Sequence, residues 1–172
     1  MCQFGREKMS KAVLLSIRPD WVEKIASGDK TVDVRKTCPQ IDLPFKCYIY
    51  CTQASPYNPC VSLHYRRQNS TVYDSFFTAR VIGEFVCDEI AYLDVDSFGL
   101  GKYYHNKFIY IDNKDSEWKT CLTRWEVLEY TKGKRPYGWH ISDLVIYDKP
   151  KKLEEFNLTR APQSWQYVEE LE

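Results

Sequence analysis

Hydrophobic and polar positions along the first 52 residues change their period several times. An unbroken apolar run over Ala12–Ile17 predicts a buried strand. Pro19 follows where the first turn of a helix needs no backbone N–H, and this helix should run to about Ser27 and end at Gly28. Alternation then predicts two further strands, over residues 31–36 and 45–52.

The remaining residues show one long loop, one capped helix and several strands. Residues 53–75, rich in Pro, Asn, Ser and Tyr, predict the loop. Thr123 and Glu126 have the spacing of a capping box, which predicts a helix over residues 124–131. Residues 94–101 indicate a short helix or loop. Strands are expected at 76–86, 107–111 and 137–147.

This order of elements predicts an α+β domain built round a small curved sheet or barrel. A length of 172 residues suits one domain, so residues 9–172 are expected to form it, with residues 1–8 as an N-terminal extension. Hydrophobic residues make up 44% of the chain and charged residues 28%, which excludes a disordered protein.

The charge balance bears on nucleic-acid binding. The formal net charge is zero, which argues against a protein that coats nucleic acid through bulk electrostatics. Residues 1–86 carry 12 basic and 8 acidic side chains, whereas residues 87–172 carry 12 and 16, so a local basic face stays possible in the first half. Aromatic residues reach 15%, and we expect most of them in the core.

The seven cysteines are odd in number and irregular in spacing. The N-terminus lacks the apolar segment of an export signal, and no apolar run is long enough to span a membrane. We therefore expect a cytoplasmic protein with reduced thiols. Cys47 and Cys51 alternate with Phe45 and Ile49 on one strand face, which favours core packing over a zinc site. No metal and no cofactor is predicted.

The candidate chemistry gathers in the segment from Gly28 to Arg35. Asp33 and Arg35 are expected on one face of a strand, about 6.5–7 Å apart, so they can share one small ligand. The Arg35 guanidinium can bind a phosphate or a base edge, and Lys30 can reach the same point from the turn. The alternative is a surface ion pair between Asp33 and Arg35, with Lys30 in solvent.

The same alternation places Val32 and Val34 in the core and the charged pair at the surface. We therefore expect Asp33 and Arg35 to reach solvent. Since exposed charges contribute little to stability, replacing Lys30 or Arg35 by alanine should leave the melting temperature nearly unchanged.

The segment resembles a known signature. Gly28-Asp29-Lys30-Thr31-Val32-Asp33-Val34-Arg35 is similar to the G-x-K-x-x-E-x-R motif of the ASCH domain, a member of the PUA-like superfamily, with Asp33 where that family has Glu. Residues 15–19, residues 137–144 and Pro150 also look like that family, so the resemblance spans about residues 9–160. It implies a PUA-like small mixed β-barrel with flanking helices. RNA, nucleotide, nucleoside or coenzyme-like ligands would bind in a cleft lined by Gly28, Lys30, Asp33 and Arg35.

Some ASCH-like proteins are enzymes. One branch removes the acyl group from acetylated cytidine with a Lys and a Thr of this motif and a Glu further along. Lys30 matches that Lys, but Asp33 stands where the Thr stands, and Thr31 lies two residues away. Another member is a metal-dependent ribonuclease. If this chain is a ribonuclease or an amidohydrolase, Lys30, Asp33 and Glu84 are the predicted catalytic residues.

Three further residues complete the predicted ligand site. His140 is expected at the cleft edge, with its neighbour Trp139 in the core, and Arg66 and Arg67 can contact phosphates from the long loop. Tyrosines accompany these arginines in the loop. Three classes stay open: an RNA- or nucleotide-binding module, a hydrolytic enzyme, and a protein-interaction domain that uses the tyrosine-rich loop.

Overall fold

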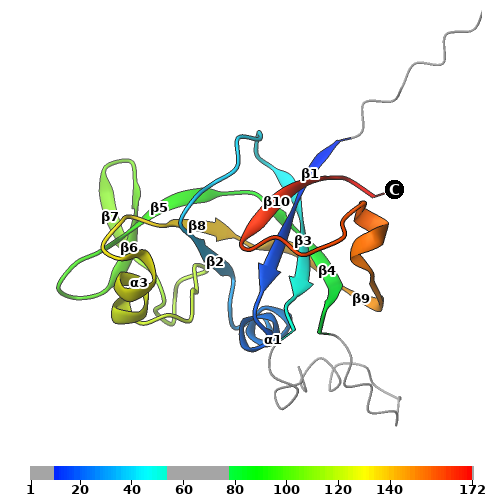
Figure 1. The fold of residues 1–172 in the computed structure, drawn as a ribbon. Helices are drawn as coiled ribbons and strands as arrows, with labels where there is room; N and C mark the ends of the chain where they lie inside the picture. The colour runs from blue at the N-terminus through cyan, green and yellow to red at the C-terminus, as the bar shows by residue number, and fades with distance from the viewer. Residues whose placement is uncertain (1–9, 54–77, 172) are drawn as a thin grey trace, which may run out of the picture.

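The computed structural model describes residues 10–53 and 78–171. Two five-stranded sheets and two α-helices make up most of this part of the chain (Figure 1). The elements are β1 (Lys11–Ile17), α1 (Pro19–Ser27), β2 (Val32–Arg35), β3 (Phe45–Cys51), β4 (Arg80–Cys87), β5 (Ile90–Val95), β6 (Leu100–Tyr104), β7 (Lys107–Tyr110), α3 (Arg124–Thr131), β8 (Tyr137–His140), β9 (Ser142–Lys151), the 3-10 helix η1 (Leu153–Phe156) and β10 (Trp165–Glu169).

The first sheet has the strand order β10-β1-β3-β4-β9. β1 and β3 are parallel, and the other neighbours are antiparallel. α1 packs its apolar side, including Val22 and Ile25, into the core of this sheet. The predicted strand face of Phe45, Cys47 and Ile49 is confirmed, since these side chains are buried in that core.

The second sheet has the order β2-β8-β5-β6-β7 and extends to the side of the first (Figure 1). Its own core contains Val32 and Val34 of β2, Leu93 of β5 and Val127 of α3. β8 and β9 connect the two sheets. The backbone N–H of Ile141, between these strands, donates to the Thr31 carbonyl at 2.8 Å, which holds the crossing point beside β2.

Local signals define both helices as predicted. Pro19 occupies the first turn of α1, and Gly28 ends it with φ 81°, a left-handed conformation that glycine adopts without strain. The Lys30 N–H then donates to the Lys24 carbonyl at 3.0 Å, which turns the chain sharply into β2. Thr123 and Glu126 form the predicted capping box of α3.

Two of the predicted elements differ from the structure, and one segment holds elements that were not predicted. Residues 94–101 form no helix but the end of β5, a turn and the start of β6. The single strand expected over 137–147 is two strands, because the chain leaves one sheet and enters the other at Ile141. The segment after Pro150, for which no element is predicted from the sequence, contains η1 and β10, and β10 pairs with β1.

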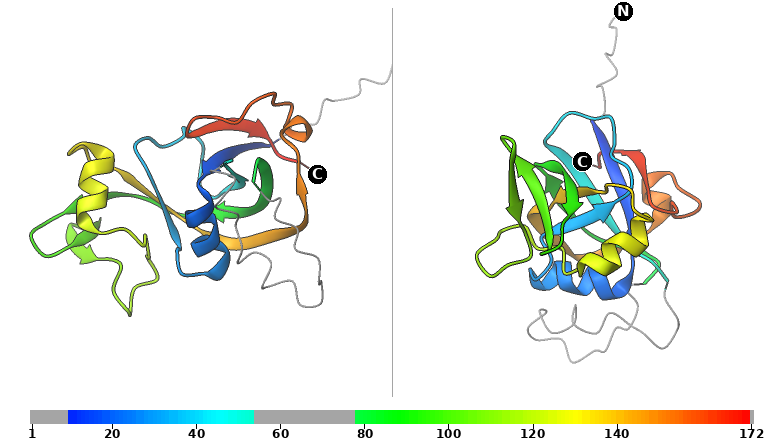
Figure 2. Two further views of the ribbon diagram at one scale, coloured as in Figure 1. Left: turned by 60° about the horizontal axis from the view of Figure 1, so that its bottom comes forward. Right: turned by 90° about the vertical axis from the view of Figure 1, so that its left-hand side faces the viewer.

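The first sheet is curved (Figure 2), and its strand order is open, with β9 and β10 at its two edges. A mixed α+β fold is therefore established, whereas a closed barrel stays a prediction. No helix within residues 10–53 and 78–171 is long and apolar enough to cross a membrane. The predicted extension 1–8 and nearly all of the 53–75 loop lie outside the described residues.

Candidate functional site

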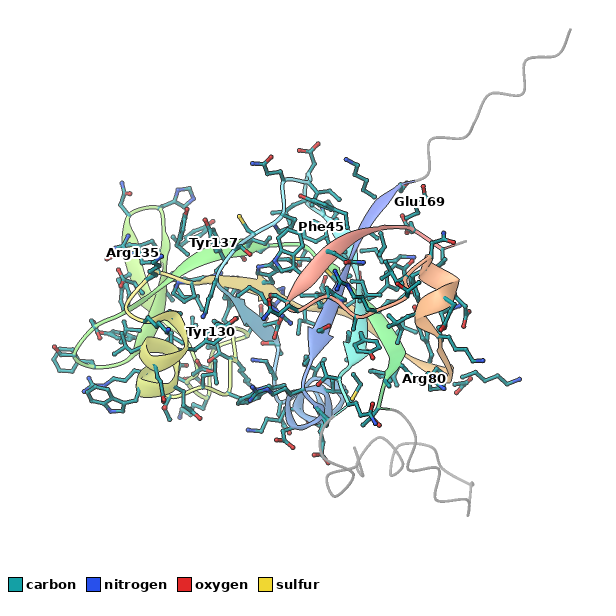
Figure 3. All side chains as sticks on the ribbon, in the orientation of Figure 1. Phe45, Arg80, Tyr130, Arg135, Tyr137 and Glu169 are labelled. Carbon is teal, nitrogen blue, oxygen red and sulfur yellow. The ribbon has the colours of Figure 1, made fainter. Side chains whose placement is uncertain are left out.

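A cavity of about 520 Å³ lies where α1, β2 and α3 meet the end of β1. It holds Lys30, Asp33 and Arg35, so the structure brings together three of the four charged residues of the predicted segment. Tyr130 contributes from α3 (Figure 3). The other lining residues are Ser16, Ile17, Arg18, Trp21, Val34, Thr52, Leu122, Glu126, Glu129, Gln163 and Ser164.

β2 has the predicted alternation but not the predicted exposure. Val32 and Val34 pack in the core of the second sheet, whereas Asp33 and Arg35 line the cavity on the other side. These two charged residues are only 6% and 7% exposed. The expectation that they reach solvent is therefore wrong. The face opposite the valines is covered by the first sheet and α1, so it is no outer surface.

Most N–H donors of the Arg35 guanidinium are hydrogen-bonded to other groups of the protein. Its Nε donates to Asp33 Oδ2 at 2.5 Å. One terminal nitrogen donates to the Ser164 carbonyl and hydroxyl, at 3.0 and 3.2 Å, and the other to the Ser16 carbonyl at 3.1 Å. A guanidinium has five N–H donors. Since four are engaged, Arg35 joins β2 to β1 and to the segment before β10, and it cannot also offer a two-pronged contact to a ligand.

Lys30 is buried without a carboxylate partner. Its side chain is at the cavity wall, the residue is 3% exposed, and Nζ donates to the Thr120 carbonyl at 2.6 Å. Nζ also lies 5.1 Å from the centre of the Trp21 ring. Desolvation by burial lowers the pKa of Lys30, and nearby Asp33 opposes this only in part. Among the described residues, no acidic side chain forms an ion pair with Lys30.

Hydrogen bonds within a loop position the Thr120 carbonyl that accepts from Lys30. Asp112, with φ 61°, accepts hydrogen bonds from the backbone N–H groups of Thr120 and Cys121 and from the Thr120 hydroxyl. The Thr31 side chain also bonds to this loop. Its hydroxyl donates to the Glu117 carbonyl and accepts from the Lys119 N–H. Thr31 therefore faces away from the cavity and is not available to act as a nucleophile in it.

Aromatic and acidic side chains complete the walls. Trp21 belongs to α1, and Tyr130 of α3 is 40% exposed at the cavity. Glu126 and Glu129 stand on α3 as well. The cavity thus contains three basic and three acidic side chains, namely Arg18, Lys30, Arg35, Asp33, Glu126 and Glu129.

Comparison with solved structures identifies the fold. The crystal structure of ASCH from Zymomonas mobilis matches with a TM-score of 0.57 and 19% identity, covering 91% of this chain and 86% of that one. Two mutants of that protein match equally, at 18% identity and TM-scores of 0.57, with 91–92% of this chain and 87–90% of theirs covered. The fold is that of an ASCH domain. No family model and no curated protein matches the sequence.

Within the ASCH fold, two predicted site residues lie away from the cavity. Glu84 on β4 accepts a hydrogen bond from Tyr147 and pairs with Lys46 at 3.4 Å, in a separate cluster. Trp139 is buried in the core as predicted. His140, however, pairs with Val32 on the opposite face of the sheet from Asp33, where it contacts Asp88 at 2.7 Å. The structure does not bring either residue to Lys30.

Gly28 acts by ending α1 and does not line the cavity, and Arg66 and Arg67 lie outside the described residues. The prediction missed Trp21, Glu129 and Tyr130. A signal for the last two was present, because Glu126, Glu129 and Tyr130 fall on one side of the predicted helix at spacings of three and four. Within residues 10–53 and 78–171, no group of three His, Cys, Asp or Glu side chains is placed to hold a metal ion.

Proposed function

We propose that the cavity binds the base of a nucleoside or of an unpaired nucleotide in RNA. The observation that carries this proposal is the Lys30 amine, buried beside the Trp21 ring without an acidic partner. A donor at this place can satisfy a carbonyl or ring nitrogen of a base, while Trp21 and Tyr130 offer flat faces for stacking. The volume of about 520 Å³ is usual for small-ligand sites.

The distribution of charge favours a base over a phosphate group as the part that enters. Arg35 already directs four donors to protein atoms, so the strongest phosphate-binding side chain of the segment is occupied. Asp33 is already paired with Arg35, so Glu126 and Glu129 on α3 are the carboxylates that would repel an anion. Carboxylates can instead accept hydrogen bonds from the amino groups of bases.

The ASCH fold supports a ligand of this class. The resemblance of the Gly28–Arg35 segment to the ASCH signature implies RNA or nucleotide ligands, and Lys30, Asp33 and Arg35 of that segment line the cavity. A protein-interaction role for the tyrosine-rich loop remains a separate hypothesis, because that loop lies outside the described residues.

A second candidate, a hydrolytic reaction on RNA or a modified nucleoside, is favoured by the lowered pKa of Lys30 alone. An amine with a lowered pKa is a better base near neutral pH. The two other residues expected to take part do not support this candidate: Asp33 is paired with Arg35, and Glu84 is elsewhere. If the reaction exists, Lys30→Met should abolish turnover, whereas Glu84→Gln should leave it unchanged.

Titration calorimetry with the four nucleosides and a short single-stranded RNA tests the proposal. Lys30→Met should weaken binding about ten- to a hundredfold, since a hydrogen bond from a charged group contributes about 1.5–3 kcal/mol. Trp21→Ala should weaken it as well. Lys24→Met is the matched control, because Lys24 Nζ lies 4.8 Å from the same Trp21 ring but does not line the cavity. Binding that is unaffected by Lys30→Met, or no binding by the parent protein, would refute the proposal.

A further inference from the structure

One face of the second sheet carries a row of aromatic side chains that begins at the cavity. Arg35 of β2 is directly opposite Tyr137 of β8, and Tyr137 is directly opposite Tyr92 of β5. Directly opposite residues in antiparallel strands point to the same face. The rings of Tyr92 and Tyr137 lie 4.5 Å apart, and their hydroxyl groups form a hydrogen bond of 2.8 Å.

The row continues across the next two strands. Leu93 of β5 is opposite Lys102 of β6, and both are buried on one face of the sheet. Their chain neighbours Tyr92 and Tyr103 therefore point to the other face, because successive side chains of a strand alternate. Tyr103 is opposite Phe108 of β7, with ring centres 5.3 Å apart. We call Tyr137, Tyr92, Tyr103 and Phe108 the tyrosine row. It crosses four neighbouring strands, a distance of roughly 14 Å at about 4.8 Å per strand.

A glycine at position 101 leaves the space in which the Phe108 ring lies. A side chain on Gly101, at the same face of β6, would collide with that ring. Tyr110 extends the aromatic surface, with its ring 5.1 Å from that of Phe108. These contacts fix the rings in place without covering them, because Tyr92 is 55% exposed and Tyr103 is 51% exposed.

Exposed apolar rings are concentrated at this end of the molecule, where β6 and β7 lie far from β1 and β3 (Figure 1). Eleven large hydrophobic side chains are exposed among the described residues, and eight of them fall between residues 92 and 130. Of these eight, Tyr92, Tyr103 and Tyr110 lie on the face of the tyrosine row, whereas Tyr104 and Ile109 lie on the opposite face. Exposed apolar patches usually mark an interaction surface. The arrangement as a row on one sheet face, joined to the cavity, points to an extended partner rather than a compact one.

We propose that the tyrosine row stacks two or three bases of a single-stranded RNA segment whose next base enters the cavity. This inference rests on the proposed function of the cavity. Aromatic side chains on one face of four neighbouring strands of this five-stranded sheet are well suited to splayed bases, since every base has a flat surface for stacking. Arg35 lines the cavity and is directly opposite Tyr137, so the row starts on the strand next to the cavity wall.

The neutral charge of the chain makes stacking the main source of affinity. A net charge of zero offers little attraction to the phosphate backbone. Near the row, Arg135 is paired with Asp94 at 2.7 Å, so this guanidinium is largely neutralised. We therefore expect binding to single-stranded RNA that depends only weakly on salt, in contrast to proteins that bind through lysine and arginine clusters.

Fluorescence anisotropy with labelled ten-nucleotide oligo(A), oligo(C) and oligo(U) RNA, alongside calorimetry with single nucleosides, tests the inference. Tyr92→Ala and Tyr103→Ala should each weaken RNA binding by about fivefold to a hundredfold, the usual effect of losing one stacking ring. Neither should change nucleoside binding in the cavity. Tyr103→Phe keeps the ring and should bind as the parent does, which separates stacking from damage to the fold.

Tyr104→Ala is the matched control, because Tyr104 follows Tyr103 in β6, is 57% exposed and faces the other way. Loss of binding in Tyr103→Ala but not in Tyr104→Ala, with a shallow salt dependence, would support the row. Equal effects of the two changes, or RNA that binds no more tightly than a nucleoside, would overturn it while leaving the cavity proposal intact. Failure of the parent to bind either probe would overturn both.

Discussion

Arg35 and Asp33, two residues apart on β2, form a buried ion pair in which Nε and Oδ2 are 2.5 Å apart and each side chain is 8% exposed. The burial of this pair changes the role that we assign to these two residues of the motif. A pair in solvent would be free to bind a ligand, whereas this one is committed to joining β2 to Ser16 and Ser164. Of the two cations in the Gly28–Arg35 segment, Lys30 is then the one without an ion pair among the described residues.

Arg35→Ala should therefore lower the free energy of unfolding by about 3–5 kcal/mol, because it leaves Asp33 as an unpaired buried charge. Arg35→Lys should also destabilise, since an ammonium cannot reproduce the four directed hydrogen bonds. Urea unfolding measures both. Arg160→Ala, at an exposed arginine, is the control and should change stability by no more than about 0.5 kcal/mol. If Arg35→Ala lowered the free energy of unfolding as little as Arg160→Ala does, the hydrogen bonds of Arg35 would have no structural importance.

The amine of Lys30 should titrate below the ordinary value of 10.5, because burial disfavours its charged form. NMR of ¹⁵N-labelled lysine side chains can follow it, with Lys30→Met to assign the signal. Between the lowered pKa and 10.5 the unfolded chain binds more protons at this site, so its contribution makes stability rise with pH in that window. Lys30→Met should remove this rise. A Lys30 signal that titrates at or above 10.5 would contradict the prediction.

Gly138→Ala should destabilise the second sheet by about 1–3 kcal/mol. A Cβ at this position would stand 2.9 Å from the Trp118 ring and 3.0 Å from Leu93 and Val32, all within a packed core. Gly99→Ala is the comparison, because its nearest contact would be an ordinary 3.6 Å to Tyr110. Thermal unfolding should separate the two variants, and equal melting temperatures would show that the core around Gly138 adapts.

Thiol reactivity should follow burial. Cys47, Cys51 and Cys87 are fully buried, and burial raises the pKa of Cys47 well above its usual value. Cys38 and Cys121 are partly exposed. Iodoacetamide at pH 8 should therefore modify Cys38 and Cys121 in the native protein and the three buried thiols only after unfolding, as peptide mass spectrometry can show. Early modification of Cys47 would indicate that the first sheet opens readily.

Glu84→Gln tests whether the carboxylate on β4 contributes to the site. Its partners are Tyr147 and Lys46, so we expect unchanged nucleoside binding and a loss of stability of no more than about 1 kcal/mol. Burial and the hydrogen bond to Glu84 raise the pKa of Tyr147, and the change should lower that pKa, which the ultraviolet absorbance of tyrosinate reports. Loss of ligand binding in this variant would place Glu84 in the functional site after all.

Short-range signals determined the elements that surround the cavity. The apolar run of β1, the proline and glycine that bound α1 and the capping box of α3 each act within a few residues, so the sequence alone predicts them. The alternation of β2 also determined that Asp33 and Arg35 share a face. The resemblance to the ASCH signature agreed with the fold found by structural comparison.

Tertiary structure alone decided what that face meets. Arg35 is bound by Ser16 and Ser164, which are 19 and 129 residues away in the chain, and no local period encodes such partners. The break at Ile141 and the pairing of β10 with β1 likewise depend on a second sheet, because a strand that changes sheets looks continuous in sequence. Alternation fixes the side to which a residue points, but only the packing of distant segments determines whether that side is solvent, core or cavity.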